Sequence, residues 1–294
     1  MTEPPERLLV RHRLPRMVAE PQCQIGRMTR PLKALTGLPP RRSLEDFIGT
    51  LPPSSNVLGL THVTSGYVLR DIIETGAISP AAPCKVLKEP LVYLFYGRPS
   101  YRTGINNGPT SLAFHCPVVV IVDPALTPPP KYAFCFDSGA FVDGMMDTHL
   151  HPYMPLFDFS IPPDVKSAST LVNGLFGSPE RYLACSEPIT FVPDPANFEA
   201  TSYCSIVKNA SSLGLDDRAS TPEFAYDRGI DLVPWVKSVI LPDSLSGDKN
   251  FGGKLTRLGI PTLDYEWQGG CRPNEYHVLI RRLVKQVYEG LNWL

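Results

Sequence analysis

Proline constrains this chain more than any other residue type. It accounts for 32 of the 294 residues, roughly twice the share of about 5% that is usual in proteins. Each proline fixes the backbone angle φ and removes an N–H donor, so it interrupts both helices and sheet ladders. We therefore expect short helices and strands joined by many loops, with no long uninterrupted helix over most of the sequence.

Composition nevertheless favours a folded protein. Hydrophobic residues make up 43% and charged residues 19% of the chain, which excludes wholesale disorder. The longest strongly apolar runs, such as residues 117–122, are far shorter than the 18 or more residues of a membrane span. Residues 8–10 are followed at once by Arg11, so the apolar core of a secretory signal is missing. We expect a cytoplasmic protein that does not associate with membranes.

The first 42 residues differ from the rest in charge. They contain nine Lys or Arg against three Glu, together with seven prolines, while the remaining chain is net acidic. No helical or strand periodicity runs through this stretch. We interpret residues 1–42 as a basic arm and residues 43–294 as a single domain. The arm would steer the protein to nucleic acid or another polyanion; the alternative is that it packs on the acidic body of the same chain.

From Ser43 onward, short helical and extended patterns follow one another. Ser43 is a suitable N-cap, because Glu45 and Asp46 would lie in the first helical turn, where the helix dipole favours carboxylates. Residues 127–197 are expected to be mainly loops, with residues 134–141 (FCFDSGAF) as a buried aromatic turn or a substrate-gating loop. Spacing predicts helices over residues 43–50, 65–76, 167–176 and 273–293, and strands over residues 56–64, 91–96, 112–123, 222–226, 235–241 and 260–265. This order favours an α+β fold.

Cysteine and histidine spacing gives no metal site. Seven cysteines are scattered without a CxxC pair, which argues against a disulfide framework and a zinc knuckle. His149 and His151 form an HxH pair near Asp143 and Asp147, and such a pair on a strand places two imidazoles on one face. Pro152 argues against a regular strand there, and no third ligand has a telling spacing. We expect reduced thiols and no bound metal.

Three segments, taken in order, point to a protein family. The motif GLTHVT carries His62 on a predicted strand before a capped helix. The motif LVYLFYGRPSYR is an aromatic strand that carries Tyr93 and is followed by further tyrosines. The motif DDRASTPEF leads into a strand that begins near Glu223. In this order they resemble the His-Tyr-Glu signature of ADP-ribosyltransferases, including those of the bacterial toxin and defence type.

That resemblance implies a split β-sheet core with flanking helices and long loops, and it implies NAD as co-substrate. The nicotinamide bond of NAD breaks through an oxocarbenium-like ribose, which a nearby carboxylate stabilises as positive charge develops. The resemblance implies Glu223 as that carboxylate, with His62 and Tyr93 holding NAD. Further NAD contacts are implied for Thr64, Tyr96, Arg98 and Tyr101. Residues 106–214 have no counterpart, and the GxGxxG phosphate motif is absent.

A second glutamate competes for the catalytic role. The motif NEYHV resembles the NEYIV signature of the poly(ADP-ribose) polymerases, which would make Glu275 catalytic. In that family the glutamate lies on a strand, whereas the apolar spacing here continues as a helix with Asn274 as its N-cap. We favour Glu223. Pro222 directly before it is unusual for a strand, because proline is confined to an edge strand or to the first position of a strand. The choice between the two carboxylates stays open at this point.

The resemblance implies an enzyme that transfers ADP-ribose from NAD to a macromolecule. The acceptor is a nucleic acid, which the basic arm would suit, or a protein. Hydrolysis of NAD by water would be a side reaction of the same chemistry. A toxin or defence effector of this kind would be held in check by an inhibitory partner protein. The alternative is a module of the same fold that binds a nucleotide or a partner without turnover.

Overall fold

The computed structural model describes residue 33 and residues 43–80, 82–100, 108–210 and 217–294. The predicted basic arm therefore lies outside the described residues apart from Lys33, and Tyr101 lies outside them as well. The Lys33 ammonium group lies 5.4 Å from the centre of the Phe157 ring, a distance that suits a cation–π contact. The division of the chain into an arm and one domain stays a prediction.

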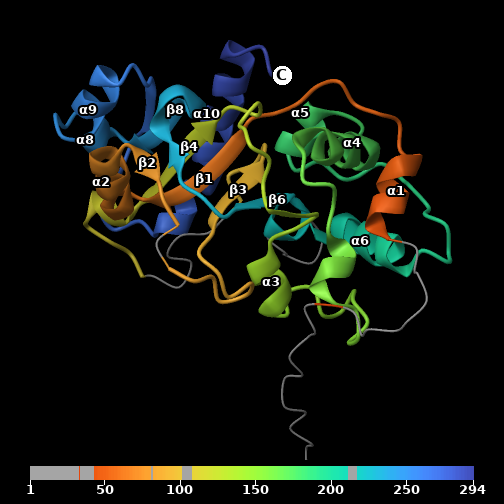
Figure 1. Cartoon of the computed structure of the whole chain (residues 1–294). Coiled ribbons are helices and arrows are strands. Elements are labelled where there is room, and N and C mark those ends of the chain that lie inside the picture. The colour runs from red at the N-terminus through yellow and green to blue at the C-terminus, as the bar shows by residue number, and fades with distance from the viewer. Residues whose placement is uncertain (1–32, 34–42, 81, 101–107, 211–216) are drawn as a thin grey trace, which may run out of the picture.

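A seven-stranded, mostly antiparallel sheet forms the centre of the fold, with strand order β5-β6-β3-β1-β4-β8-β9 (Figure 1). Among the strands of the described residues, only β8 and β9 pair in parallel. A separate two-stranded sheet pairs β2 with β7. The strands span β1 Leu60–Ser65, β2 Ala77–Ile78, β3 Val92–Tyr96, β4 Pro117–Val122, β5 Tyr132–Phe134, β6 Glu223–Tyr226, β7 Ile230–Asp231, β8 Val236–Pro242 and β9 Thr262–Tyr265.

Helices flank this sheet, so the predicted α+β class is confirmed. In Figure 1, α1, α4, α5 and α6 gather on one side of the molecule, and α2, α8 and α9 gather on the other. The α-helices are α1 Leu44–Thr50, α2 Gly66–Thr75, α3 Ser138–Val142, α4 Val165–Phe176, α5 Pro179–Leu183, α6 Phe198–Ala210, α7 Leu232–Trp235, α8 Asp243–Ser246, α9 Gly252–Arg257 and α10 His277–Gly290. Short 3-10 helices are η1 Ala113–His115, η2 Leu156–Phe159, η3 Asp217–Ser220 and η4 Pro273–Tyr276.

The two strands at the middle of the sheet are joined by a short ladder. β1 and β3 pair only at Leu60↔Tyr96 and Thr61↔Phe95, so the ladder ends directly before His62. Beyond that point β1 stays paired with β4 through its whole length, and β3 stays paired with β6. The sheet therefore opens between β1 and β3 at the level of His62, while each strand keeps its outer neighbour.

Local capping chemistry explains where the first helices begin and end. Ser43 caps α1 as predicted, because its Oγ accepts the Asp46 N–H at 3.2 Å while the Asp46 carboxylate accepts the Ser43 N–H at 2.7 Å. Gly76 ends α2 in the left-handed conformation with φ of 71°, which glycine adopts without steric cost. Ser65 occupies the N-cap position of α2, but its side chain makes no cap hydrogen bond.

The core is deepest around β4 and the C-terminal helix. Every residue of β4 is buried, which means that both faces of the sheet are covered at this strand. The helix predicted over residues 273–293 is confirmed as η4 followed by α10. Its Tyr288 is fully buried, and the phenol donates to the Gly59 carbonyl at 3.2 Å and to the Gly97 carbonyl at 2.9 Å. The helix thus contacts the chain just before β1 and just after β3.

The prediction of loops over residues 127–197 is wrong at β5, α3 and α5, which lie there beside the predicted α4. β5 is only three residues long and takes its place at the sheet edge from pairing with β6, which is distant in sequence. The sequence did not predict α6. At its start an apolar residue faces solvent and a charged one faces the core, since Phe198 is 65% exposed whereas Glu199 is buried, so the usual apolar spacing of a helix is lost there. Among the described residues, no helix is both long enough and apolar enough to cross a membrane.

Candidate functional site

The three strands that carry the predicted His-Tyr-Glu set are neighbours in the sheet. β3 with Tyr93 lies between β1 with His62 and β6 with Glu223. Residues that are far apart in the sequence are therefore brought into one region, centred on the place where the sheet opens. No hydrogen bond or ion pair joins His62 directly to Glu223 within the described part of the chain; the Tyr93 carbonyl contacts His62, and the Tyr93 side chain interacts electrostatically with Glu223.

His62 is fixed by the strand beside it. Its Nδ1 lies 3.0 Å from the Tyr93 carbonyl oxygen, which can only accept, so Nδ1 carries the proton and donates. Burial lowers the pKa of His62, while the bond to Tyr93 acts in the opposite direction. The neutral ring then presents Nε2 as an acceptor, and Nε2 has no hydrogen-bond partner among the described residues. A neutral histidine in this state can accept a hydroxyl proton but carries no charge.

Tyr93 faces away from the core, as the strand alternation predicts. Val92 and Leu94 are buried on either side of it, whereas Tyr93 is only half-buried. Its hydroxyl donates to the Cys84 Sγ at 2.7 Å. Burial raises the pKa of Tyr93, and the nearby charge of Glu223 raises it further. The phenol therefore stays protonated, and it lies close enough to Glu223 for the two groups to interact.

Glu223 begins β6 with its carboxylate inside the protein. Only 3% of the residue is exposed, and its cross-strand partners are Phe95 on β3 and Phe134 on β5. The Oε2 atom accepts the Ser138 N–H at 3.3 Å. The Oε1 atom is buried and has no hydrogen-bond partner among the described residues. Burial and the charge of Asp137 raise the pKa of Glu223 well above its usual value, against the lowering effect of Ser138.

Sequence reasoning missed three groups around this carboxylate. Ser138 supplies the N–H to Glu223, and Asp137 caps α3 by accepting the Ala140 N–H at 2.8 Å. Cys84 accepts the Tyr93 hydroxyl and also the Val86 N–H at 3.2 Å. The N-cap pattern of Asp137 was a usable signal for α3. No sequence signal indicated Cys84, which comes near Tyr93 only through the turn before β3.

Tyr96 and Arg98, two of the predicted NAD contacts, lie inside the protein. Tyr96 is 1% exposed, and its hydroxyl accepts the Leu58 N–H at 3.0 Å. Arg98 is also 1% exposed, and its guanidinium binds groups of the protein interior. Both side chains bond groups of the protein itself in this structure. Thr64 is buried on β1, two residues beyond His62 and opposite Val118 of β4, so it lies on the same face of the strand as His62.

The rival Glu275 lies in a different setting. It is exposed on η4, and its Oε2 accepts the Arg272 N–H at 2.8 Å. The carboxylate therefore has a structural explanation at the beginning of the C-terminal helix. Arg272, rather than the predicted Asn274, occupies the N-cap position of η4. Of the two carboxylates, only that of Glu223 is buried with an unpaired oxygen.

The histidine pair does not form part of a metal site in the described structure. The His149 Nδ1 lies 3.0 Å from the Ser205 Oγ, and the His151 Nδ1 accepts the Tyr153 N–H at 3.3 Å. Among the described residues, no group of three or more His, Cys, Asp or Glu side chains is arranged to hold a metal ion.

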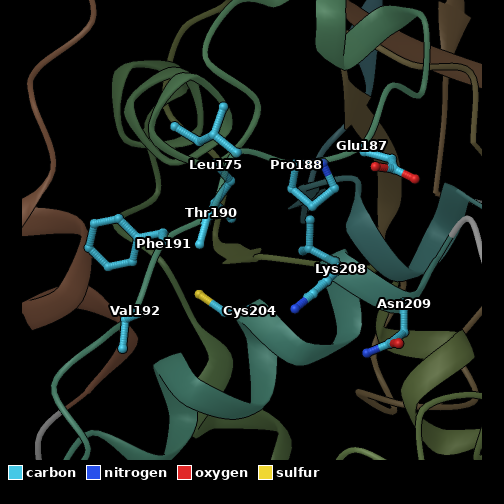
Figure 2. A pocket seen from close by; sticks show the side chains of 11 residues that line it. Leu175, Glu187, Pro188, Thr190, Phe191, Val192, Cys204, Lys208 and Asn209 are labelled. Carbon is cyan, nitrogen blue, oxygen red and sulfur yellow. The ribbon is translucent and has the colours of Figure 1, made fainter.

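A cavity of about 420 Å³ lies between α4, residues 187–192 and α6 (Figure 2). In Figure 2, Cys204 and Lys208 come from α6, and Thr190 and Pro188 lie above them in the view. Burial raises the pKa of Cys204 to about 11, so this thiol is protonated at neutral pH. None of the residues predicted to bind NAD lines the cavity.

Comparison with known proteins gives no assignment. No protein-family model matches the sequence, no curated protein matches it significantly, and no solved structure matches the fold significantly.

Proposed function

We propose that this protein is an NAD-dependent ADP-ribosyltransferase that breaks the bond between nicotinamide and ribose. The observation that carries the proposal is the Oε1 atom of Glu223, a buried carboxylate oxygen without a partner among the described residues. Leaving such an atom unpaired costs roughly 1 to 3 kcal/mol, and more for a charged group. A buried orphan of this kind marks a place where a ligand hydroxyl would restore the missing hydrogen bond.

The chemistry of the reaction gives Glu223 a role. As nicotinamide leaves, positive charge develops on the ribose. The hydrogen bond between a carboxylate and a ribose hydroxyl becomes stronger as this charge develops. The Ser138 N–H holds the other carboxylate oxygen, so Glu223 would not have to reorganise during the step. The raised pKa of Glu223 favours its protonated form in the free protein, and the cationic nicotinamide ring of NAD would favour ionisation on binding.

The two other members of the set would hold the substrate. The His62 Nε2 offers an acceptor to a ribose hydroxyl, since its Nδ1 is already committed to the Tyr93 carbonyl. The Tyr93 ring is half-buried beside Glu223 and offers a flat apolar surface to the nicotinamide. Thr64 lies on the strand face of His62 and stays in the proposal as a binding residue. The split-sheet fold of the family also belongs to the proposal, and the opening between β1 and β3 supports it.

The acceptor is a nucleic acid or a protein, and the net positive charge of residues 1–42 supports the first. A cytoplasmic toxin or defence effector restrained by an inhibitory partner protein is the biological setting that we propose. Water would compete as an acceptor and yield free ADP-ribose.

The test is the substitution Glu223→Gln, which keeps the shape of the side chain and removes its charge. We expect nicotinamide release from NAD to fall about 100-fold or more, because the carboxylate no longer stabilises the developing charge. NAD binding, measured by calorimetry, should be largely retained. Glu275→Gln is the matched control and should leave nicotinamide release unchanged.

The outcomes separate the enzyme from a binding module. A wild-type protein that binds NAD but releases no nicotinamide would identify a module without turnover. Loss of activity in Glu275→Gln rather than in Glu223→Gln would give the catalytic role to the other carboxylate. Mass spectrometry of protein and nucleic acid after incubation with isotopically labelled NAD identifies the acceptor.

A further inference from the structure

Arg98 is a buried cation in the segment directly after β3. Its Nε donates to the Tyr182 carbonyl at 2.8 Å, its Nη2 donates to the same oxygen, and its Nη1 donates to the Ser220 Oγ at 3.0 Å. The guanidinium lies 3.8 Å from the centre of the Tyr182 ring. No carboxylate of the described residues pairs with it. A charge buried on neutral acceptors is costly, so this arrangement points to a role beyond filling space.

The acceptor of Nη1 belongs to the segment that delivers Glu223. Ser220 ends η3, three residues before Glu223. A second bond lies beside the first, because the Ser100 Oγ donates to the Thr221 Oγ1 at 2.7 Å. Thr221 in turn donates to the Asp217 carbonyl at 2.7 Å, which closes η3 into a compact turn. Two consecutive residues before β6 are therefore held by two residues after β3.

The same segment also reaches the strand of His62. The Arg98 carbonyl accepts the Thr61 hydroxyl at 2.7 Å, and Thr61 directly precedes His62. The Tyr96 N–H donates to the Pro222 carbonyl at 2.9 Å, immediately before Glu223. These bonds link the residue before His62 to the residues before Glu223 across β3, alongside the short β1–β3 ladder.

We propose that Arg98 is a positioning residue that sets where the Glu223 carboxylate lies relative to His62. The proposal rests on the proposed function of the site and gives Arg98 a task other than the phosphate contact expected from the sequence. Arg98 does not touch substrate in this arrangement. It acts through Ser220 on the start of β6 and through its own carbonyl on β1. A displacement of about 1 Å at a reacting group can lower the rate about 100-fold, so this positioning has a measurable kinetic signature.

The experiment compares Ser220→Ala, Arg98→Lys and the control Ser238→Ala. Ser238 is a matched buried serine, 2% exposed, whose hydroxyl donates to the Pro261 carbonyl at 3.2 Å on the far part of the sheet. We expect kcat for nicotinamide release to fall about tenfold in Ser220→Ala and about 100-fold in Arg98→Lys. The KM for NAD should stay within about twofold. Ser238→Ala should change neither constant.

Ser220→Ala keeps the test sharp if Arg98→Lys does not fold. Equal kcat values in Ser220→Ala and Ser238→Ala, or a rise in KM alone, would overturn the positioning role. Amide hydrogen exchange of Thr221, Glu223 and Phe224 gives a readout that does not depend on activity. If the wild-type protein releases no nicotinamide, the proposed function fails; faster exchange in Ser220→Ala than in Ser238→Ala still supports the positioning of Glu223, and unchanged exchange overturns it.

Discussion

The two carboxylate oxygens of Glu223 have different environments. Oε2 accepts a backbone N–H, while Oε1 is buried without a partner among the described residues. Strand alternation was enough to predict that Tyr93 would face outward, because Val92 and Leu94 are apolar. The same rule fails for Arg98, because the chain turns at Gly97, where φ is 71°, and alternation no longer describes which side a residue faces.

The raised pKa of Glu223 predicts how stability depends on pH. A group that binds its proton more tightly in the folded state stabilises the fold below its unfolded pKa, about 4.5, and this contribution is lost as pH rises toward the folded pKa. Glu223→Gln stays neutral at every pH. We therefore expect the free energy of unfolding of the wild type to fall, relative to Glu223→Gln, as pH rises above about 4.5. Urea unfolding of both proteins from pH 4 to pH 8 measures this difference, and a difference that does not vary with pH would contradict it.

At the scale of single elements, the sequence predicted what local chemistry decides. Caps and apolar spacing located α1, α2, α4 and the C-terminal helix, and runs of β-branched and aromatic residues located most strands. β5 was missed because three residues carry too little pattern, and its pairing with β6 comes from distant sequence. The end of the β1–β3 ladder directly before His62 could not be predicted, because no local signal states where a ladder stops.

Substitution of Gly97, in the turn after β3, tests how tightly this region is packed. A Cβ at Gly97 would lie 2.7 Å from the Leu58 Cδ1 and 2.9 Å from the Tyr182 Cε1, whereas a Cβ at Gly76 meets nothing within 4 Å, and both glycines have φ of 71°. In Gly76→Ala the free energy of unfolding should fall by about 1 to 2 kcal/mol, which is the cost of holding an alanine in the left-handed conformation. In Gly97→Ala the free energy of unfolding should fall by about 1 to 3 kcal/mol more than in Gly76→Ala, because the added methyl group overpacks its neighbours.

Urea unfolding of the two glycine variants and the wild type gives the comparison. Equal losses in Gly97→Ala and Gly76→Ala would show that the neighbours of Gly97 move aside freely, against the tight packing described.

At the scale of the whole molecule, the C-terminal helix contacts the closed end of the β1–β3 ladder, opposite to the end where the sheet opens. Tyr288 on α10 bonds the carbonyls of Gly59 and Gly97, which flank β1 and β3, and the Tyr288 ring packs near Trp293, with ring centres 5.7 Å apart. The sequence predicted this helix from its apolar stripe. It could not predict the contact, because a tyrosine on an apolar stripe does not state which carbonyls its hydroxyl will meet.

Tyr288→Phe removes these two bonds and keeps the ring. The Gly59 carbonyl still accepts the Gly97 N–H at 2.9 Å, so only the Gly97 carbonyl is left without a donor among the described residues. We expect the free energy of unfolding to fall by about 1 to 2 kcal/mol. Tyr67→Phe, at a tyrosine that is 55% exposed, is the control and should change it by less than about 0.5 kcal/mol. A loss no larger than that of Tyr67→Phe would contradict the structural role of the hydroxyl.

The place of β6 in the sheet also sets an order of events during synthesis. β6 lies between β3 and β5, two strands that leave the ribosome well before it, and pairing across such sequence separations is slow. A nascent chain can hold His62 and Tyr93 while the slot for β6 is still empty, and it then lacks the Glu223 carboxylate. On the proposed function, an incomplete chain cannot consume the NAD of the cell that makes it, and activity begins only once β6 has entered the sheet.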